Sequence, residues 1–488
     1  MERKNKFWMI AAICLAALFL AESCFFIIFV AQSGGEDNNV NVIQPATIRG
    51  KVMNDLGEML LANIVIESTD GKTVLKTTNV LSGYEIQLEE GDYILHYSRG
   101  MQYSTVTKKI SVESFKNYYL EDIRLVRLYD AAADNYYAGD LHQHTLFSDG
   151  SDTVEELARA DIAAGLSWAL LSDHNDNTGI SEWMQTSRFV YDIKDGQYKY
   201  FTPIPGCEIT TAYGHFQSIG SSAVVEQWEI ELSLGEDPIE EVKIITEEIV
   251  RNGGICQLNH PYSTGGMGFN SYDGEWDLIG NFNTIEIWNG YFETPGYITP
   301  NGELNQNRQS MLKWFELLNQ GYRIFATSGT DLHSSEGSYN PNLYNESDPY
   351  SAYKKELKKT GQYAGMPTYF AYAAGEVTTK KILDAIENGH GFVTNGVLIF
   401  ADVDGRVYGE TAQAGDGNKT VNVELFCRDG LTKLNIYKNG EYFSQIDVSG
   451  TNYTGSIQLQ GIEAGDWIVI EAYGESVYYA VTNPIFFD

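Results

Sequence analysis

Cysteine is scarce in this sequence, with five residues among 488. Cys14 and Cys24 lie in an apolar stretch near the N-terminus, and Cys207, Cys256 and Cys427 are scattered without CxxC spacing. This distribution excludes a disulfide framework or a thiolate zinc site as the organising feature of the fold. We expect the three scattered cysteines to be buried apolar residues.

Basic residues are also few, with 33 Lys and Arg against 66 Asp and Glu, and the formal net charge is −33. Such a surface repels phosphate backbones, and the sequence has no basic patch to offset this repulsion. We therefore expect a small-molecule substrate and no nucleic acid partner. The hydrophobic content of 43% excludes a disordered chain, and the length allows two to four domains.

A long apolar run, Phe7 to Ala31, follows a basic N-terminus. It exceeds the roughly 20 residues that a helix needs to cross a bilayer, and the basic flank favours a cytoplasmic N-terminus. We expect a transmembrane anchor or signal segment at 7–31 and a linker at 32–45. The protein is then a single-pass cell-membrane protein with its catalytic part outside, in contact with the membrane through this helix only. In the alternative interpretation, cleavage at Ala31-Gln32-Ser33 releases a secreted protein.

The rest of the chain changes pattern twice. Residues 46–128 contain short alternating runs such as Asn63–Ser68 and Tyr84–Leu88, which predict a β-sandwich resembling the carboxypeptidase-regulatory-like module. Residues 135–400 alternate apolar strands with helical stretches, which predicts an α/β region with a parallel sheet closed into a barrel. The helical stretches are Thr153–Ala164, Ile239–Asn252, Asn307–Gln320 and Thr378–Asn388. Strand patterns return in 401–488 and predict a C-terminal β-domain.

Histidine is the most informative residue type, although the chain has only eight. His142 and His144 form a His-x-His pair whose side chains share one face of an extended strand. Further strand-like runs end in His174, Glu208, His260 and the Asp331-Leu-His333 segment. Since β/α barrels build active sites at the carboxyl ends of their strands, we expect these side chains to converge on a metal site.

The other candidates are weaker. His215 lies in Tyr-Gly-His-Phe, and Asp149 lies in Ser-Asp-Gly, which is also an ordinary turn sequence. Asp140 and Asp173 are better interpreted as residues that orient ligands than as ligands. His96 and His390 we assign to ordinary surface or core roles.

Imidazole and carboxylate ligands without thiolate suit Zn, Mn or Fe and do not single one out. A carboxylate such as Glu208 can bridge two ions that lie about 3.5–4 Å apart. The reaction indicated is attack of a metal-activated hydroxide on a phosphorus or carbonyl centre.

The ordered series DLHxHTxxSDG, SDHN, GCEIT, GHF, NHP and TDLH resembles the PHP (polymerase and histidinol phosphatase) metallohydrolases, and within them the carbaryl-esterase-like group. The resemblance covers residues 135–400 and the closing Thr482-Asn-Pro-Ile segment. It implies a distorted (β/α)7 barrel with two or three divalent ions. It also implies that Glu208, Asp331 and His333 take part in catalysis.

The resemblance divides the ligands among three ions. The first set is His142, His144, Glu208 and Asp331; the second is Glu208, His215 and His260; the third is Asp149, His174 and His333. The third set is the most variable in the family, at the position of Asp149. His390 stands where an Arg would be more usual, so no phosphate clamp is expected there. Candidate substrate contacts are Asn175, Tyr262, Glu286 and Asn289.

Three functions remain open from the sequence. The first is an extracellular metal-dependent hydrolase of a small phosphoester or phosphodiester. The second is hydrolysis of a carboxylic ester, amide or carbamate at the same site. The third is a noncatalytic surface protein that binds glycan, which predicts a decayed ligand set. All the ligands of the pattern are present, so the sequence favours an enzyme.

Overall fold

The computed structural model describes residues 44–71, 73–78, 80–211, 213–221, 238–263, 268–269, 275–290, 294–297, 302–335, 357, 360–361, 363–375 and 377–488. The anchor expected at 7–31 and nearly all of the linker expected at 32–45 lie outside these residues. Among the described residues, no helix has the length and apolar character needed to cross a bilayer.

The N-terminal region is built from short strands. They are β1 (Ala46–Gly50), β2 (Val52–Asn54), β3 (Asn63–Ser68), β4 (Thr73–Thr78), β5 (Tyr84–Leu88), β6 (Gly91–Ser98), β7 (Val106–Val112), β8 (Asn117–Tyr119) and β9 (Ile123–Leu125). They pair as β4-β3-β6-β7, β5-β1-β8 and β2-β9. Along β5 every second residue is buried, so this strand gives one face to a core that includes Ile48, Ile64 and Leu95.

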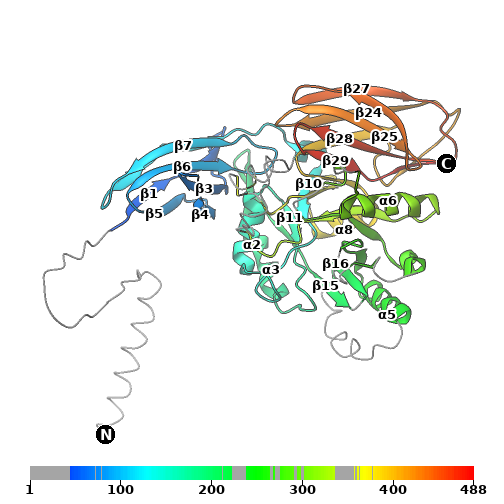
Figure 1. The fold of residues 1–488 in the computed structure, drawn as a ribbon, viewed down its shortest axis with the longest axis horizontal. Coiled ribbons are helices and arrows are strands. Elements are labelled where there is room, and N and C mark those ends of the chain that lie inside the picture. The colour runs from blue at the N-terminus through cyan, green and yellow to red at the C-terminus, as the bar shows by residue number, and fades with distance from the viewer. Residues whose placement is uncertain are drawn as a thin grey trace, which may run out of the picture. The chain divides into compact units, whose positions relative to one another are not determined.

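The region that follows alternates strands with helices (Figure 1). Besides a separate hairpin of β12 (Val190–Lys194) and β13 (Gln197–Tyr200), its strands are β10 (Tyr136–Asp140), β11 (Trp168–Leu170), β14 (Thr202–Ile204), β15 (Gly206–Thr211), β16 (Gly214–Ile219), β17 (Ile255–Leu258), β18 (Thr284–Asn289), β19 (Phe325–Gly329), β20 (Thr368–Tyr372) and β21 (Gly391–Thr394). Its α-helices include α2 (Val154–Ala163), α3 (Ile180–Gln185), α5 (Pro238–Arg251), α6 (Gln306–Asn319) and α8 (Thr379–Glu387). The fold is therefore mixed α/β, as the sequence predicts.

Two sheets share these strands. β10, β11 and β14 are parallel neighbours in one sheet, and β17, β18 and β19 are parallel neighbours in the other. Single parallel bridges join the sheets, between Gln143 and Leu332 and between His174 and Glu208. The strands thus form a ring whose two joints carry or adjoin the predicted ligands.

The ring is not wholly parallel, in contrast to the sheet that the strand–helix alternation predicts. β15 runs antiparallel to β16, and β16 runs antiparallel to β17. The link from Thr211 to Gly214 is too short for a helical crossover, which needs a dozen or more residues. Thr211 closes this turn, since its hydroxyl donates to the Gly214 carbonyl and accepts from the Tyr213 amide. β20 is antiparallel to β10 and to β21.

The C-terminal strands continue the β10 sheet. They are β22 (Val397–Val403), β23 (Thr411–Ala412), β24 (Lys419–Cys427), β25 (Leu431–Lys438), β26 (Glu441–Asp447), β27 (Asn452–Leu459), β28 (Trp467–Gly474), β29 (Tyr479–Thr482) and β30 (Ile485–Phe487). β29 pairs with β21, and β28, β25 and β26 extend the same sheet, while β22, β24 and β27 form a second one. The orange and red strands of Figure 1 are this part of the chain.

A side chain of the C-terminal region also binds β19. Asn483 accepts from the Ala326 amide at 2.7 Å and donates to the Ala326 carbonyl at 3.0 Å. β19 leads directly to Asp331 and His333, so the closing Thr-Asn-Pro-Ile segment fixes a strand that delivers predicted ligands. The three scattered cysteines are buried and unpaired, as expected.

Candidate metal centre

Glu208, in β15, lies at the centre of the histidine cluster and is completely buried. Its Oε1 is 3.1 Å from His215 Nδ1 and 3.2 Å from His260 Nε2. Its Oε2 is 3.0 Å from His142 Nε2 and 3.4 Å from His144 Nε2. The two oxygens of one carboxylate thus face two different sets of imidazoles, which is the arrangement that a bridging ligand requires.

The first expected ligand set comes together as a group. Ligand atoms of His142, His144, Glu208 and Asp331 all lie within 4.8 Å of one another. Asp331 Oδ1 is 3.1 Å from His144 Nε2 and 3.4 Å from His142 Nε2. Asp331 has a φ of 50°, a left-handed conformation that is uncommon outside glycine. The backbone after β19 is therefore strained at the residue whose carboxylate faces the histidines.

The second set is assembled differently from the expectation. His174, Glu208 and His215 form a group within the same 4.8 Å, whereas the sequence assigns Glu208, His215 and His260. His174 Nδ1 lies 3.1 Å from Glu208 Oε2 and 2.6 Å from Thr210 Oγ1. His260 still contacts the bridging carboxylate. The second position therefore has four side chains around it.

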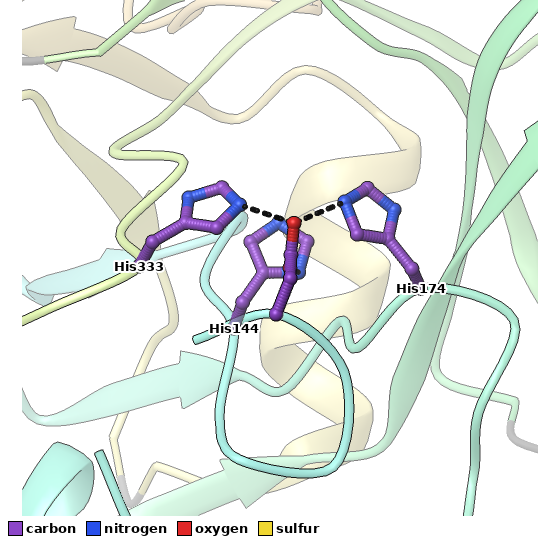
Figure 2. A group of neighbouring side chains, drawn as sticks. His144, His174 and His333 are labelled. Atoms are coloured by element: carbon purple, nitrogen blue, oxygen red, sulfur yellow. Dashed lines mark ion pairs between the residues drawn. The ribbon is translucent and has the colours of Figure 1, made fainter. Parts of the chain in front are cut away.

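The third set is the most exposed. His144, Asp149, His174 and His333 form the group, which adds His144 to the three expected residues. Asp149 Oδ2 is 3.2 Å from His333 Nε2 and 3.6 Å from His174 Nε2, and dashed lines mark these ion pairs in Figure 2. In that view the rings of His174 and His333 reach toward the same point from opposite sides. The Asp149 side chain is 56% exposed and that of His333 41%, so the cluster opens to solvent here.

Unsatisfied atoms test whether these residues fit metal ions. His142 Nε2, His144 Nδ1, His260 Nδ1 and Glu208 Oε2 are buried and have no hydrogen-bond partner. A buried polar atom without a partner lowers the free energy of unfolding by roughly 1–3 kcal/mol, so four in one cluster would destabilise the fold considerably. Bound cations satisfy lone pairs of this kind, so the donor set fits divalent metal.

The charge states of the two carboxylates and of His174 agree with this fit. Burial opposes the ionised form of Glu208, but His142, His215 and His260 hold the pKa of its carboxyl well below its usual range. Burial likewise opposes ionisation of Asp331, and His142 and His144 lower the pKa of that carboxyl. Burial lowers the pKa of His174 to about 4. Ionised carboxylates and a neutral imidazole are the forms that bind metal. Burial opposes protonation of His142 and His260, but Glu208 raises the pKa of both rings, so a metal ion would displace a proton from each of them.

Glu286 is a positioning residue rather than the substrate contact expected from the sequence. It is completely buried, and its Oε1 lies 3.1 Å from His142 Nδ1. Its Oε2 accepts from the His260 amide at 2.8 Å. Such a carboxylate fixes the tautomer of a ligating histidine and turns Nε2 toward the metal. Asn289 acts in a similar way, since its Nδ2 donates to Asp331 Oδ2 at 3.3 Å.

Asp140 and Asp173 hold backbone rather than imidazole rings. Asp140 accepts from the amides of His142 and Thr330, which ties β10 to the end of β19. Asp173 accepts from the amide of Thr145 and thereby fixes the loop after His144. Asn259, not singled out from the sequence, donates to Glu208 Oε1 at 2.9 Å. Its place just before His260 at a strand end was the available signal.

The remaining candidates lie elsewhere or hold loops. Asn175 exchanges hydrogen bonds with the backbone of Thr210, so it supports the strand end beside His174. Tyr262 stacks near Trp276, with ring centroids 6.1 Å apart. His390 lies in the α8–β21 turn, and burial lowers the pKa of its imidazole. His96 lies in β6 and bonds to Glu67 and Thr107.

Comparison with known proteins places the chain in a family. Residues 140–388, slightly more than half of the chain, match the PHP domain. The chain belongs to the PHP domain family. It is a metal-dependent hydrolase, and the ligand cluster described above lies within the matched residues or at their edge. No curated protein matches the chain.

Solved structures with some similarity to this PHP protein include three bacterial proteins. A two-domain protein containing a predicted PHP-like metal-dependent phosphoesterase from Bacteroides vulgatus is 18% identical, with 72% of this chain and 96% of that one covered and a TM-score of 0.37. A putative metal-dependent phosphoesterase from Bifidobacterium adolescentis is 16% identical, with 42% and 89% covered and a TM-score of 0.28. An amidohydrolase from Chromobacterium violaceum is 15% identical, with 40% and 87% covered and a TM-score of 0.26.

Proposed function

We propose that this PHP protein hydrolyses a small phosphoester or phosphodiester outside the cell, anchored by the N-terminal segment 7–31. Divalent ions held by the cluster would supply Lewis-acid activation of water and neutralise charge on the substrate. The chain's own residues position these ions. Glu208 joins two sets of imidazoles, and Glu286 and Asn289 orient His142 and Asp331.

The observation that supports a phosphate substrate is the third ligand group, because Asp149, His174 and His333 would add a third ion and so set the charge of the site. Its carboxylates are Asp149, Glu208, Glu286 and Asp331. Among the described residues they form ion pairs with histidines and none with Lys or Arg. Three divalent ions would carry six positive charges against these four negative ones. The surplus suits a phosphate group, which carries roughly −1.5 to −2. Two ions would leave no surplus and would suit an uncharged ester or amide.

The geometry of the open side supports attack from solvent. Asp149 and His333 are the exposed ligands, whereas His142, His144 and Glu208 are completely buried. A substrate therefore meets the third group first. His333 lies at this opening, and its Nδ1 donates to the Asp331 carbonyl, which orients the ring and leaves Nε2 for a metal ion.

The test is hydrolysis by the purified chain, stripped of metal and reloaded with Mn or Zn. Substrates are nitrophenyl phosphate, bis-nitrophenyl phosphate and nitrophenyl acetate. Metal-dependent release of nitrophenol from a phosphate substrate, lost in His142→Ala and Glu208→Ala and kept in His96→Ala, supports the proposal. Turnover of the acetate alone would contradict a phosphate substrate and would indicate a hydrolase of carboxylic esters, amides or carbamates.

A further inference from the structure

Gln143 separates the two histidines of the His-x-His pair and is itself completely buried. Its main chain is fixed to Ser172: the Gln143 amide donates to Ser172 Oγ at 2.9 Å, and the Gln143 carbonyl accepts from the Ser172 amide at 3.1 Å. Neighbouring side chains of an extended segment point to opposite sides. The Gln143 side chain accordingly lies away from the metal cluster and contacts α2.

Its partner on α2 is Asp161, which has no exposed surface. Gln143 Nε2 donates to Asp161 Oδ2 at 3.0 Å. The other two polar atoms of the pair, Asp161 Oδ1 and Gln143 Oε1, are buried and have no partner. If Asp161 were ionised, both would be acceptors without a donor, and burial of such atoms is costly.

The surroundings of Asp161 disfavour a charge. The ionisable groups that act on it are Asp140, on β10, and Asp152, in the loop before α2, and both are acidic. Arg99, in the loop after β6, is nearby in the fold but donates to the Ile162 carbonyl, and no ion pair of Asp161 exists among the described residues. Burial, reinforced by these carboxylates, raises the pKa of Asp161 well above its ordinary 3.8.

We infer that Asp161 is a neutral carboxylic acid at neutral pH, and that its hydroxyl donates to Gln143 Oε1. One proton then satisfies both orphaned atoms and completes a two-way acid–amide pair. Asp161 is a positioning residue, because it acts on His142 and His144 only through Gln143. The effect of Asp161 on metal affinity rests on the metal centre proposed above, but the protonation of Asp161 does not.

Two substitutions separate the acid–amide pair from an ionised aspartate. Asp161→Asn keeps the size and offers an amide N–H to Gln143 Oε1 and an oxygen to Gln143 Nε2, so metal affinity stays at the wild-type level. Asp161→Ala leaves Gln143 without a partner, and affinity for Mn or Zn falls by about 10–100-fold, as for other outer partners of metal ligands. Equal losses in the two variants would overturn the inference.

The protonation itself is visible in an infrared difference spectrum, wild type minus Asp161→Asn, without metal at about pH 7.5. Burial raises the pKa of Asp140 only to about 6, so Asp140 is ionised at this pH. A C=O band of a neutral carboxylic acid supports the inference, and its absence overturns it. If neither variant folds, the same band in wild type carrying 13C-labelled aspartate decides.

Thermal unfolding gives a second reading. An acid with a raised pKa in the folded state takes up a proton on folding, so its stabilising contribution is complete below pH 3.8 and declines as pH rises through the folded pKa. The Tm of Asp161→Asn, measured without metal, should therefore gain on that of wild type from pH 5 to 8. A Tm difference that stays constant, or that shifts in favour of wild type as pH rises, would contradict a neutral Asp161. Loss of hydrolysis in both proteins, with this pH behaviour intact, would count against the proposed function alone.

Discussion

Glu208 and Glu471 are both completely buried, and their neighbours differ in kind. Glu471, in β28, accepts from Arg308 at 3.1 Å and from the hydroxyls of Tyr473 and Tyr479 at 2.8 Å each. Glu208 faces imidazoles, and its Oε2 lacks a hydrogen-bond donor. A carboxylate surrounded by donors is already stabilised by the protein. The Oε2 of Glu208 lacks such a donor and can be satisfied by a cation, so we infer that Glu471 is structural and that Glu208 is a metal ligand.

The largest effect should come from Glu208→Gln. An amide cannot supply the negative charge that two ions would share. We therefore expect kcat/KM on the best nitrophenyl substrate to fall by more than about 100-fold, which exceeds the loss typical of residues that only orient metal ligands. The measurement is steady-state hydrolysis after reloading with Mn or Zn. Circular dichroism controls for folding, and full activity in the variant would break the comparison.

Glu471→Gln should act on stability instead. Removing one partner of a buried ion pair leaves Arg308 uncompensated and costs about 3–5 kcal/mol of unfolding free energy. Urea unfolding measures this loss. Metal content at low temperature should stay unchanged, and a variant of normal stability that had lost its metal would reverse the roles of the two glutamates.

Glu286→Gln should weaken metal binding without removing it. The variant loses the carboxylate that orients His142, so affinity should fall by about 10–100-fold. Competition with a coloured chelator measures the affinity. Glu316→Gln is the matched control, since Glu316 pairs with Lys313 on the surface of α6, and both variants behaving alike would refute the orienting role.

His96→Gln should have the smallest effect. His96 pairs with Glu67 at 3.0 Å in the N-terminal β-rich region, and each of its ring nitrogens has one partner. We expect a change of about 1 kcal/mol or less in unfolding free energy. Metal content and hydrolysis should be normal. A loss of metal in this variant would mean that the N-terminal β-rich region contributes to metal binding.

Local signals in the sequence predicted much of this architecture. Thr153 and Glu156 form a capping box, so the start of α2 was predicted to within one residue. Strand ends likewise marked His174 and His260, which follow β11 and β17, because the carboxyl ends of parallel strands lie at one edge of the ring, whereas Glu208 lies within β15.

Long-range pairing could not be predicted in the same way. The extension of the β10 sheet by β29 depends on residues about ninety positions apart in the chain, such as Phe392 and Thr482, and no local pattern encodes that register. From the sequence, Glu286 was a candidate substrate contact, and its segment was equally consistent with a structural strand end. The contact of Glu286 with His142 Nδ1 depends on tertiary packing, and so does the position of His174 beside Glu208.

Metal stoichiometry tests the central claim most directly. Elemental analysis of the full chain, reloaded with Mn or Zn and freed of excess ion, should give two or three ions per chain in wild type and His96→Gln. Glu208→Gln should retain at most one ion, because two of the three ligand groups contain the Glu208 carboxylate and only the group of His144, Asp149, His174 and His333 does not. A folded wild-type chain without bound metal, or equal metal content in wild type and Glu208→Gln, would contradict the account.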